Sequence, residues 1–242
     1  MKKSLLAGVS LAAVALASGV QAADLGSRPS YKAPVLAPAP WSWAGFYIGA
    51  NVGIASARSS IADDPSTTFP WLGTPIDANK TGVIGGLQAG YNWQFTNLVL
   101  GLEGDISFAS LNRSANSVLF GGADVYNARL NALGTLRGRV GWAFDRVLVY
   151  GTGGVAFASL KNELTDPPSV IGFTASPGSN VTGWTVGGGF EYAFTDHWTA
   201  KAEYLHVGFP TRTAHDTGVG LGYVFAFKDS LDIGRVGINY KF

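Results

Sequence analysis

The chain has 242 residues, with 17 basic and 16 acidic side chains and a formal net charge of +1. Only 14% of the residues are charged, against about 25% in ordinary soluble domains, whereas 47% are hydrophobic, 12% aromatic and 33 are glycine. This composition excludes a disordered chain, offers no basic cluster for nucleic acid and, without cysteine, excludes disulfides and thiol chemistry.

Residues 1–22 predict a cleaved signal peptide. Lys2 and Lys3 precede an apolar run at 5–17, and Val20-Gln21-Ala22 supplies the small residues of a cleavage site. The run is shorter than the roughly 20 residues that a membrane-spanning helix needs. We therefore expect an exported chain.

Residues 23–42 predict a periplasmic linker. The prolines of this stretch stand among small residues and favour an extended chain over a packed domain; they are Pro29, Pro34, Pro38 and Pro40. The alternative is a proline-motif ligand. The third predicted part of the chain is a β-barrel over residues 43–242.

The rest of the chain alternates between apolar and polar positions with period two, as strands with two different faces do. We predict seven clear strands, at 46–54, 83–95, 98–108, 130–144, 184–194, 198–204 and 236–242. An eighth, at 147–160, is ambiguous in its facing, because Leu148 and Tyr150 compete with Val149, Val155 and Phe157 for the apolar face.

An aromatic-x-Phe signature recurs every 48 to 50 residues, at Phe95, Phe144, Phe194 and Phe242. Short turns follow the first three signatures, and longer loops are expected near 58–81, 112–126, 161–181 and 208–229. Each repeat then holds two strands, so four repeats predict an all-β, eight-stranded antiparallel transmembrane barrel with short periplasmic turns and long extracellular loops. A propeller has a similar period but needs four strands per repeat.

The apolar faces carry aromatic residues at one common end, which is typical of a membrane interface. The predicted aromatic girdle consists of Trp93, Phe95, Trp142, Phe144, Tyr192, Phe194, Trp198 and Tyr240. In the alternative, a lipocalin-like barrel, the same residues would cluster inside. The signal peptide and the low charge favour the membrane barrel.

If the apolar face meets lipid, the opposite face lines the lumen with four acids and five bases. They are Glu103, Asp105, Arg137, Arg139, Glu191, Lys201, Glu203, Arg235 and Lys241. Side chains roughly fill the bore of an eight-stranded barrel, and an unpaired charge there is costly, so we predict a plug of ion pairs.

Amides on the same faces should assist this plug, namely Asn51, Gln88, Asn131 and Asn239. On the strand at 130–144, the apolar face is assigned to Leu130 and Leu136, opposite Asn131 and Thr135. Inward glycines such as Gly49 and Gly90 would leave volume unfilled, which keeps a narrow ion pathway as the alternative.

The sequence predicts no enzyme, no cofactor and no metal site. Its candidate general bases, His197, His206 and His215, fall in a turn, late in a strand and in a loop, without a recognisable Ser-His spacing. Asp63-Asp64 and His215-Asp216 are candidates for binding a cation at loop tips, but isolated pairs of this kind are expected to be solvated. Gly187-Gly188-Gly189 lies within a strand rather than before a helix, so it is not a phosphate loop.

Ala23-Asp24-Leu25, residues 43–53 and residues 239–242 resemble the small outer-membrane β-barrel surface antigens of rhizobial and related alphaproteobacteria, within the opacity-protein-like porin superfamily. The resemblance covers nearly the whole chain and implies an OmpA-like barrel in the outer membrane of a Gram-negative bacterium. It also implies insertion by the barrel assembly machinery, which would read Tyr240 and Phe242, and a role in envelope integrity among membrane lipid and lipopolysaccharide.

We therefore expect a structural barrel and surface antigen with a plugged lumen. The alternatives are a small porin and an adhesin or ligand receptor that acts through its loops. Apolar residues in the predicted loops favour the latter weakly: Phe69, Trp71, Phe120 and Phe173. Residues 223–227 fit a strand extension better. The sequence does not identify a surface ligand.

Overall fold

The computed structural model describes residues 41–65, 75–116, 125–165, 174–177, 180–215 and 224–242, so the predicted signal peptide lies outside the described residues. The described residues form ten strands: β1 (Gly45–Asp63), β2 (Ile76–Phe95), β3 (Leu98–Asn116), β4 (Val125–Phe144), β5 (Val147–Thr165), β6 (Thr174–Ala175), β7 (Asn180–Ala193), β8 (Trp198–Gly208), β9 (Arg212–His215) and β10 (Val224–Lys241). In this part of the chain, no helix is long and apolar enough to cross a membrane.

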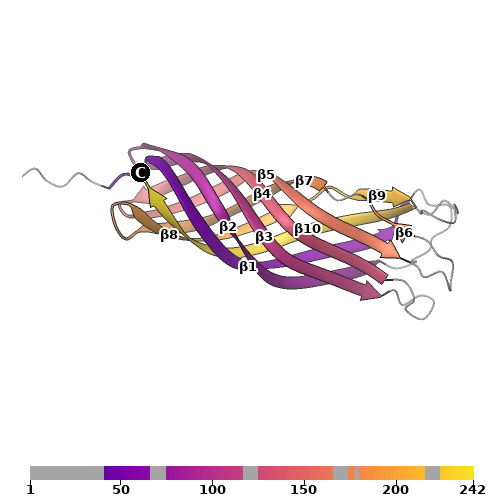
Figure 1. Cartoon of the computed structure of the whole chain (residues 1–242). Helices are drawn as coiled ribbons and strands as arrows, with labels where there is room; N and C mark the ends of the chain where they lie inside the picture. Colours follow the sequence, from indigo (N-terminus) through magenta and orange to yellow (C-terminus); the bar gives the residue numbers. More distant parts are fainter. Residues whose placement is uncertain (1–40, 66–74, 117–124, 166–173, 178–179, 216–223) are drawn as a thin grey trace, which may run out of the picture. The chain divides into compact units, whose positions relative to one another are not determined.

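The eight long strands close into one antiparallel barrel (Figure 1). Consecutive long strands pair along the chain, and β1 pairs with β10, with Ile48 opposite Tyr240. The two short strands are additions, because β6 pairs only with the end of β5 and β9 only with β10. The predicted eight-stranded antiparallel barrel is confirmed.

Tight turns join the strands at the end of the barrel where the chain terminates. Thr96 and Asp145 have left-handed backbone, with φ of 56° and 52°, as two-residue hairpin turns require. Between β7 and β8, the Thr195 hydroxyl accepts a hydrogen bond from the Trp198 amide at 3.0 Å. The tight turns therefore begin directly after the Phe signatures.

The strands are longer than predicted at the opposite end. β1 continues to Asp63 and β5 to Thr165, while β2 begins at Ile76 and β10 at Val224, inside the predicted loops 58–81, 161–181 and 208–229. β3 and β4 likewise shorten the predicted loop 112–126. Most of the predicted extension at 223–227 is strand, whereas the four apolar loop residues lie outside the described residues.

The loops were overestimated because the polarity of the two barrel faces is exchanged partway along the strands. On β1 the outward residues are Phe46, Ile48, Ala50, Val52 and Ile54, and then Ser56, Arg58 and Ser60. The inward residues change in the opposite sense at the same height, from Asn51 to Ala55 and Ala57. β10 repeats this exchange between Arg235 and Ile233. The alternation continues, but with its faces swapped.

We call the end of the barrel with the tight turns the lower end. The outward apolar residues between this end and the exchange of faces form a band around the barrel, which we call the apolar band. On β1 it runs over residues 46–54, a length that matches the roughly 9–11 residues with which a tilted strand crosses a bilayer. Its upper edge is a ring of polar outward residues: Ser56, Thr81, Ser159, Thr182, His206 and Asp232. A hydrocarbon layer therefore fits only the lower half of the barrel.

Above the apolar band the barrel wall separates into two sheets. Among the described residues, pairing of β2 with β3 stops at Ile84 opposite Ala109, and pairing of β7 with β8 stops at Trp184 opposite Gly208. Upper β1, β2 and β10 with β9 form one sheet, and upper β3, β4 and β5 with β6 form the other.

We call this upper part the two-sheet extension. A buried apolar cluster draws residues from both sheets: Ile61, Ile76, Ala78, Tyr126, Leu164, Ala175, Ala214, Phe225 and Phe227. The ring centroids of Tyr126 and Phe227 are 6.0 Å apart, which is within the usual range for an aromatic pair. The extension is thus packed like a water-exposed sandwich, with its apolar side inside.

One facing assignment from the sequence was wrong. A bulge shifts the register of β4 between Leu130 and Ala132, so that Leu130 is buried inside and Asn131 is exposed outside. An extra residue in one strand reverses the alternation beyond it. On β5 the ambiguity is resolved, because Leu148 and Tyr150 are buried and Val149 is exposed.

The exchange of faces predicts a large effect of an introduced arginine at one height of β1 and a small effect at another. Ala50→Arg places a charge in the middle of the apolar band and should lower the free energy of unfolding in lipid vesicles by about 2–4 kcal/mol. Ser60→Arg, on the same face of β1 in the two-sheet extension, should change it by less than about 1 kcal/mol. Denaturant titration of the inserted protein measures both, and equal losses would contradict the placement of the band.

Candidate functional site

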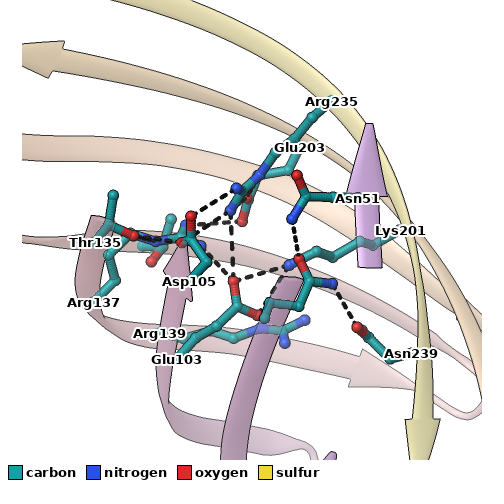
Figure 2. A network of polar contacts seen from close by, with 12 residues as sticks. Asn51, Glu103, Asp105, Thr135, Arg137, Arg139, Lys201, Glu203, Arg235 and Asn239 are labelled. Carbon is teal, nitrogen blue, oxygen red and sulfur yellow. Dashed lines mark hydrogen bonds and ion pairs between the residues drawn. The ribbon is translucent and has the colours of Figure 1, made fainter. Parts of the chain in front are cut away.

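The interior of the lower barrel is the candidate site, because it collects nearly all of the predicted lumen charges. Eight of the nine are buried there: Glu103, Asp105, Arg137, Arg139, Glu191, Lys201, Glu203 and Arg235. They come from β3, β4, β7, β8 and β10, at alternate positions that face inward. Strands far apart in the sequence are therefore joined through their side chains (Figure 2).

Arg137 is the junction of the network. Its guanidinium is 1% exposed and pairs with Glu103, with Asp105 at 3.1 Å and with Glu203 at 3.0 Å. Arg235 lies on the other side of the same acids, 3.1 Å from Asp105 and 2.6 Å from Glu203. Two guanidinium groups thus share the carboxylates of β3 and β8, and charge-assisted contacts of this kind are the strong ones.

The network extends toward the end of the barrel with the tight turns through Glu103 and Glu191. The ammonium group of Lys201 lies 2.9 Å from both oxygens of Glu103, and Arg139 pairs with Glu191. Asn239 donates a hydrogen bond to Glu191 at 2.7 Å. These contacts connect β8 to the carboxylate on β3, and β4 and β10 to the carboxylate on β7.

The buried charges of this network balance, with four acids and four bases. The fifth predicted base, Lys241, lies apart at the rim of the barrel, where its ammonium donates to the carbonyl oxygen of Ser42 at 2.6 Å and lies 4.6 Å from the Trp41 ring. Lys241 therefore does not join the lumen network. Neutrality is what a narrow, poorly solvated bore requires.

Neutral side chains complete the hydrogen bonding of the acids. Tyr47 donates to Glu103 at 2.7 Å, Tyr150 donates to Glu203 at 3.0 Å, and Thr135 donates to Asp105. The sequence analysis did not assign these three residues to the site. Their inward position in the alternation was the available signal, but a tyrosine on a mixed face reads equally well as an apolar residue.

An amide chain lies beside the ion pairs. Asn51 donates to Gln88 at 2.8 Å, and Gln88 donates to Asn239 at 2.6 Å (Figure 2). Three of the four predicted amides therefore come together. The fourth, Asn131, does not, because the β4 bulge turns it outward.

The inward glycines do not leave the bore empty. A β-carbon at Gly49 would fall on the side-chain oxygen of Asn239, and one at Gly90 would fall on the hydroxyl of Tyr47. The side chains of larger neighbours thus occupy the space that is free at these glycines. The observation that favoured an ion pathway in the sequence is removed by this packing.

An apolar layer closes the network on the side of the tight turns. Trp43 is 2% exposed and packs in a cluster with Val99, Ala143, Leu148, Tyr150 and Ala193, with Trp41 against it. The Trp43 indole donates to the Asp145 carbonyl at 3.0 Å, and its backbone amide donates to Gln94 at 2.6 Å. The segment before β1 is therefore tied into the barrel mouth.

A second apolar layer covers the network on its other side. Its buried residues are Ala55, Ala57, Ile84, Leu130, Leu133, Ala156, Ala158, Leu160, Val181, Leu205, Val207, Phe209, Leu231 and Ile233. Above it, Asp229 is buried and accepts hydrogen bonds from Asn162 at 2.7 Å and Arg212 at 2.9 Å. The charged layer is thus enclosed between two apolar layers.

The predicted girdle residues lie at the turn end of the barrel with their side chains outward. Most of the eight are exposed to a similar degree, from 41% at Trp198 to 60% at Phe95. Tyr240 packs between its neighbours, with ring centroids 5.1 Å from Trp198 and 5.2 Å from Phe242. They form the lower edge of the apolar band.

The histidines do not assemble into a site. His197 stacks on Tyr240 in a turn, His206 contacts Asp232 at 2.8 Å on the outer face, and His215 ends β9. Within the described part of the chain, no group of three or more His, Asp or Glu residues is placed to hold a metal ion. Asp216 lies outside that part.

Comparison with known proteins places this arrangement among bacterial envelope proteins. A family model described as the outer membrane protein β-barrel domain matches residues 9–225. A 31 kDa outer-membrane immunogenic protein of Brucella melitensis is 34% identical, with all of both chains aligned. A 22 kDa outer membrane protein of Rhizobium leguminosarum is 30% identical over 83% of this chain and 79% of its own length.

Two solved structures share the fold with a TM-score of 0.51. The outer membrane protein OprG of Pseudomonas aeruginosa is 16% identical, and the alignment covers 82% of this chain and 96% of that one. The outer membrane protease OmpT of Escherichia coli is 11% identical, with 82% and 97% covered. At these identities the likeness concerns the fold alone.

Arg137→Ala should destabilise the barrel strongly. The substitution leaves three buried carboxylates short of a partner, and breaking a buried ion pair costs about 3–5 kcal/mol. Thermal unfolding in detergent measures the loss. Arg58→Ala is the control, since the exposed Arg58 pairs with Asp232 at 3.6 Å and exposed pairs contribute about 1 kcal/mol or less. Unchanged melting of Arg137→Ala would contradict the plug.

Proposed function

The chain belongs to the outer membrane protein β-barrel family, and from this premise we propose that it is a structural barrel with a plugged lumen that supports envelope integrity. The resemblance found in the sequence is confirmed by the relatives from Brucella and Rhizobium. The location in the outer membrane follows from the family.

The continuous filling of the bore supports a structural role over a porin. An open pore needs a hydrated path, whereas here a neutral ion network lies between the apolar layer around Trp43 and the apolar layer around Leu205. Arg137 binds β3 and β8 across the bore, so removing the plug would also remove contacts that hold the strands together. The buried charges therefore stabilise the barrel wall and do not form a pathway for ions.

We further propose that the face above the apolar band is a surface antigen. The Brucella melitensis relative is named for its immunogenicity, and the two-sheet extension carries the connecting segments away from the membrane. Membrane lipid and lipopolysaccharide would surround the apolar band. Residues 1–22 would direct export, and the terminal strand with Tyr240 and Phe242 would be read by the barrel assembly machinery.

A catalytic function has no support in the arrangement of the described residues. The protease OmpT shares the fold at 11% identity, which transfers no activity. His206 with Asp232 faces outward beside Trp184, at the upper edge of the apolar band, where a soluble substrate would have to displace lipid. We propose no enzyme and no cofactor.

Planar-bilayer recording tests the plugged barrel against the porin. The folded mature protein should insert without unitary conductance steps, because buried side chains occupy the bore at each height. Folding is verified in the same sample by resistance of the barrel to protease and by a different electrophoretic mobility of the unheated and the heated protein. Reproducible steps that change in Arg137→Ala would reject the plug and establish a narrow porin.

A further inference from the structure

Two exposed bases face each other on the outer wall of the two-sheet extension. Arg129 on β4 and Lys161 on β5 are direct partners in the antiparallel register. Both side chains are exposed. Directly opposed side chains lie about 5 Å apart at their β-carbons, and like charges in this arrangement are destabilising.

Neither base is neutralised by an ion pair within the described residues, whereas two other bases on the outer surface of the barrel are. Arg58 pairs with Asp232, and Arg146 pairs with Asp196 at 2.8 Å. The nearest acid along β5, Glu163, lies opposite Asn127 instead, and its carboxylate accepts a hydrogen bond from Thr165 at 3.4 Å. An anion from outside the chain would relieve the repulsion.

The pair lies at the height of the lipid headgroups. On β5 the last outward residue of the apolar band is Phe157, followed by Ser159 and then Lys161. Four residues correspond to about 13 Å along a strand, and to less along the barrel axis because the strands tilt. A headgroup layer begins directly outside the hydrocarbon, within reach of long basic side chains.

The β4 bulge adds a polar neighbour between the pair and the apolar band. The register shift between Leu130 and Ala132 turns Asn131 outward, two residues from Arg129. Without the bulge, the alternation would have put Asn131 inside. Bulges often redirect a side chain in this way at functional positions. A guanidinium, an ammonium and an amide therefore line one outward patch.

We propose that Arg129 and Lys161, with Asn131 beneath them, bind a phosphate group on the sugar headgroup of lipopolysaccharide. Arginine suits a phosphate because its planar fork can donate two hydrogen bonds, and lysine adds a compact charge. This inference rests on the proposed function, since it requires the apolar band to lie in the outer membrane. It adds the residues that hold one lipid and the group they recognise.

Lipid retention tests the site. The mature protein and Arg129→Gln/Lys161→Gln are refolded in phosphatidylcholine vesicles containing bisphosphorylated lipid A, and bound lipid A is counted after extraction into mild detergent. The double variant should retain lipid A about tenfold more weakly, as expected for the loss of two charged contacts. Arg58→Gln, two outward positions above Ile54 on β1, is the matched control and should change retention less than about twofold.

Two further measurements identify the ligand. Dephosphorylated lipid A should bind the unsubstituted protein as weakly as lipid A binds the double variant, and inorganic phosphate alone should not displace lipid A at equal concentration. Equal binding of both lipids, equal loss in Arg58→Gln, or displacement by inorganic phosphate would each overturn the proposal. A chain that never inserts would instead contradict the proposed function.

Discussion

The structure of this barrel depends on one requirement: each charge inside its narrow bore must be neutralised by a partner. Eight strands enclose too little space for free water, so a carboxylate inside must find its cation across the bore rather than in solvent. Arg137 meets that need for three acids at once, from β3 and β8. The shape of the lower barrel, the positions of its inward glycines and the apolar layers on either side all follow from this crowded, neutral centre.

The exchange of faces divides the wall into two regimes with different solvents. Below the exchange, lipid outside permits apolar residues and the ion network fills the inside; above it, water outside permits Arg58 and Ser60 while the inside becomes apolar. Closure is obligatory only where lipid cannot hydrogen bond to a strand edge. The wall accordingly separates into two sheets above Ile84 and Trp184, where water can satisfy the free backbone groups.

The sequence predicted the lower barrel well, because lipid enforces a strict alternation that Trp93, Trp142 and Tyr192 mark at a constant spacing. It predicted the two-sheet extension poorly. Where the apolar residues move from the outer to the inner face, the outward alternation of the lower strands ends, which in the sequence indicates the start of a loop. The ion-pair partners could not be predicted either. The alternation shows that Glu103 and Arg137 face inward, but only the register of the strands brings them together. Leu130 and Asn131 were misplaced by one inserted residue, and Lys241 by its position at the very end of a strand, where Trp41 and Ser42 offer it another environment.

The two-sheet extension also bears on how the barrel reaches its final place. The nine residues of β1 beyond the apolar band, which include Arg58, Ser59 and Ser60, must cross the membrane before they reach the far side. During this passage the groups that later face water are stripped of it, at a cost of up to several kcal/mol for each polar group left without a partner. Residues that contact no lipid in the finished barrel therefore add to the barrier to its insertion. Each polar residue added to the exposed part of such a barrel therefore raises the barrier to crossing without widening the apolar band.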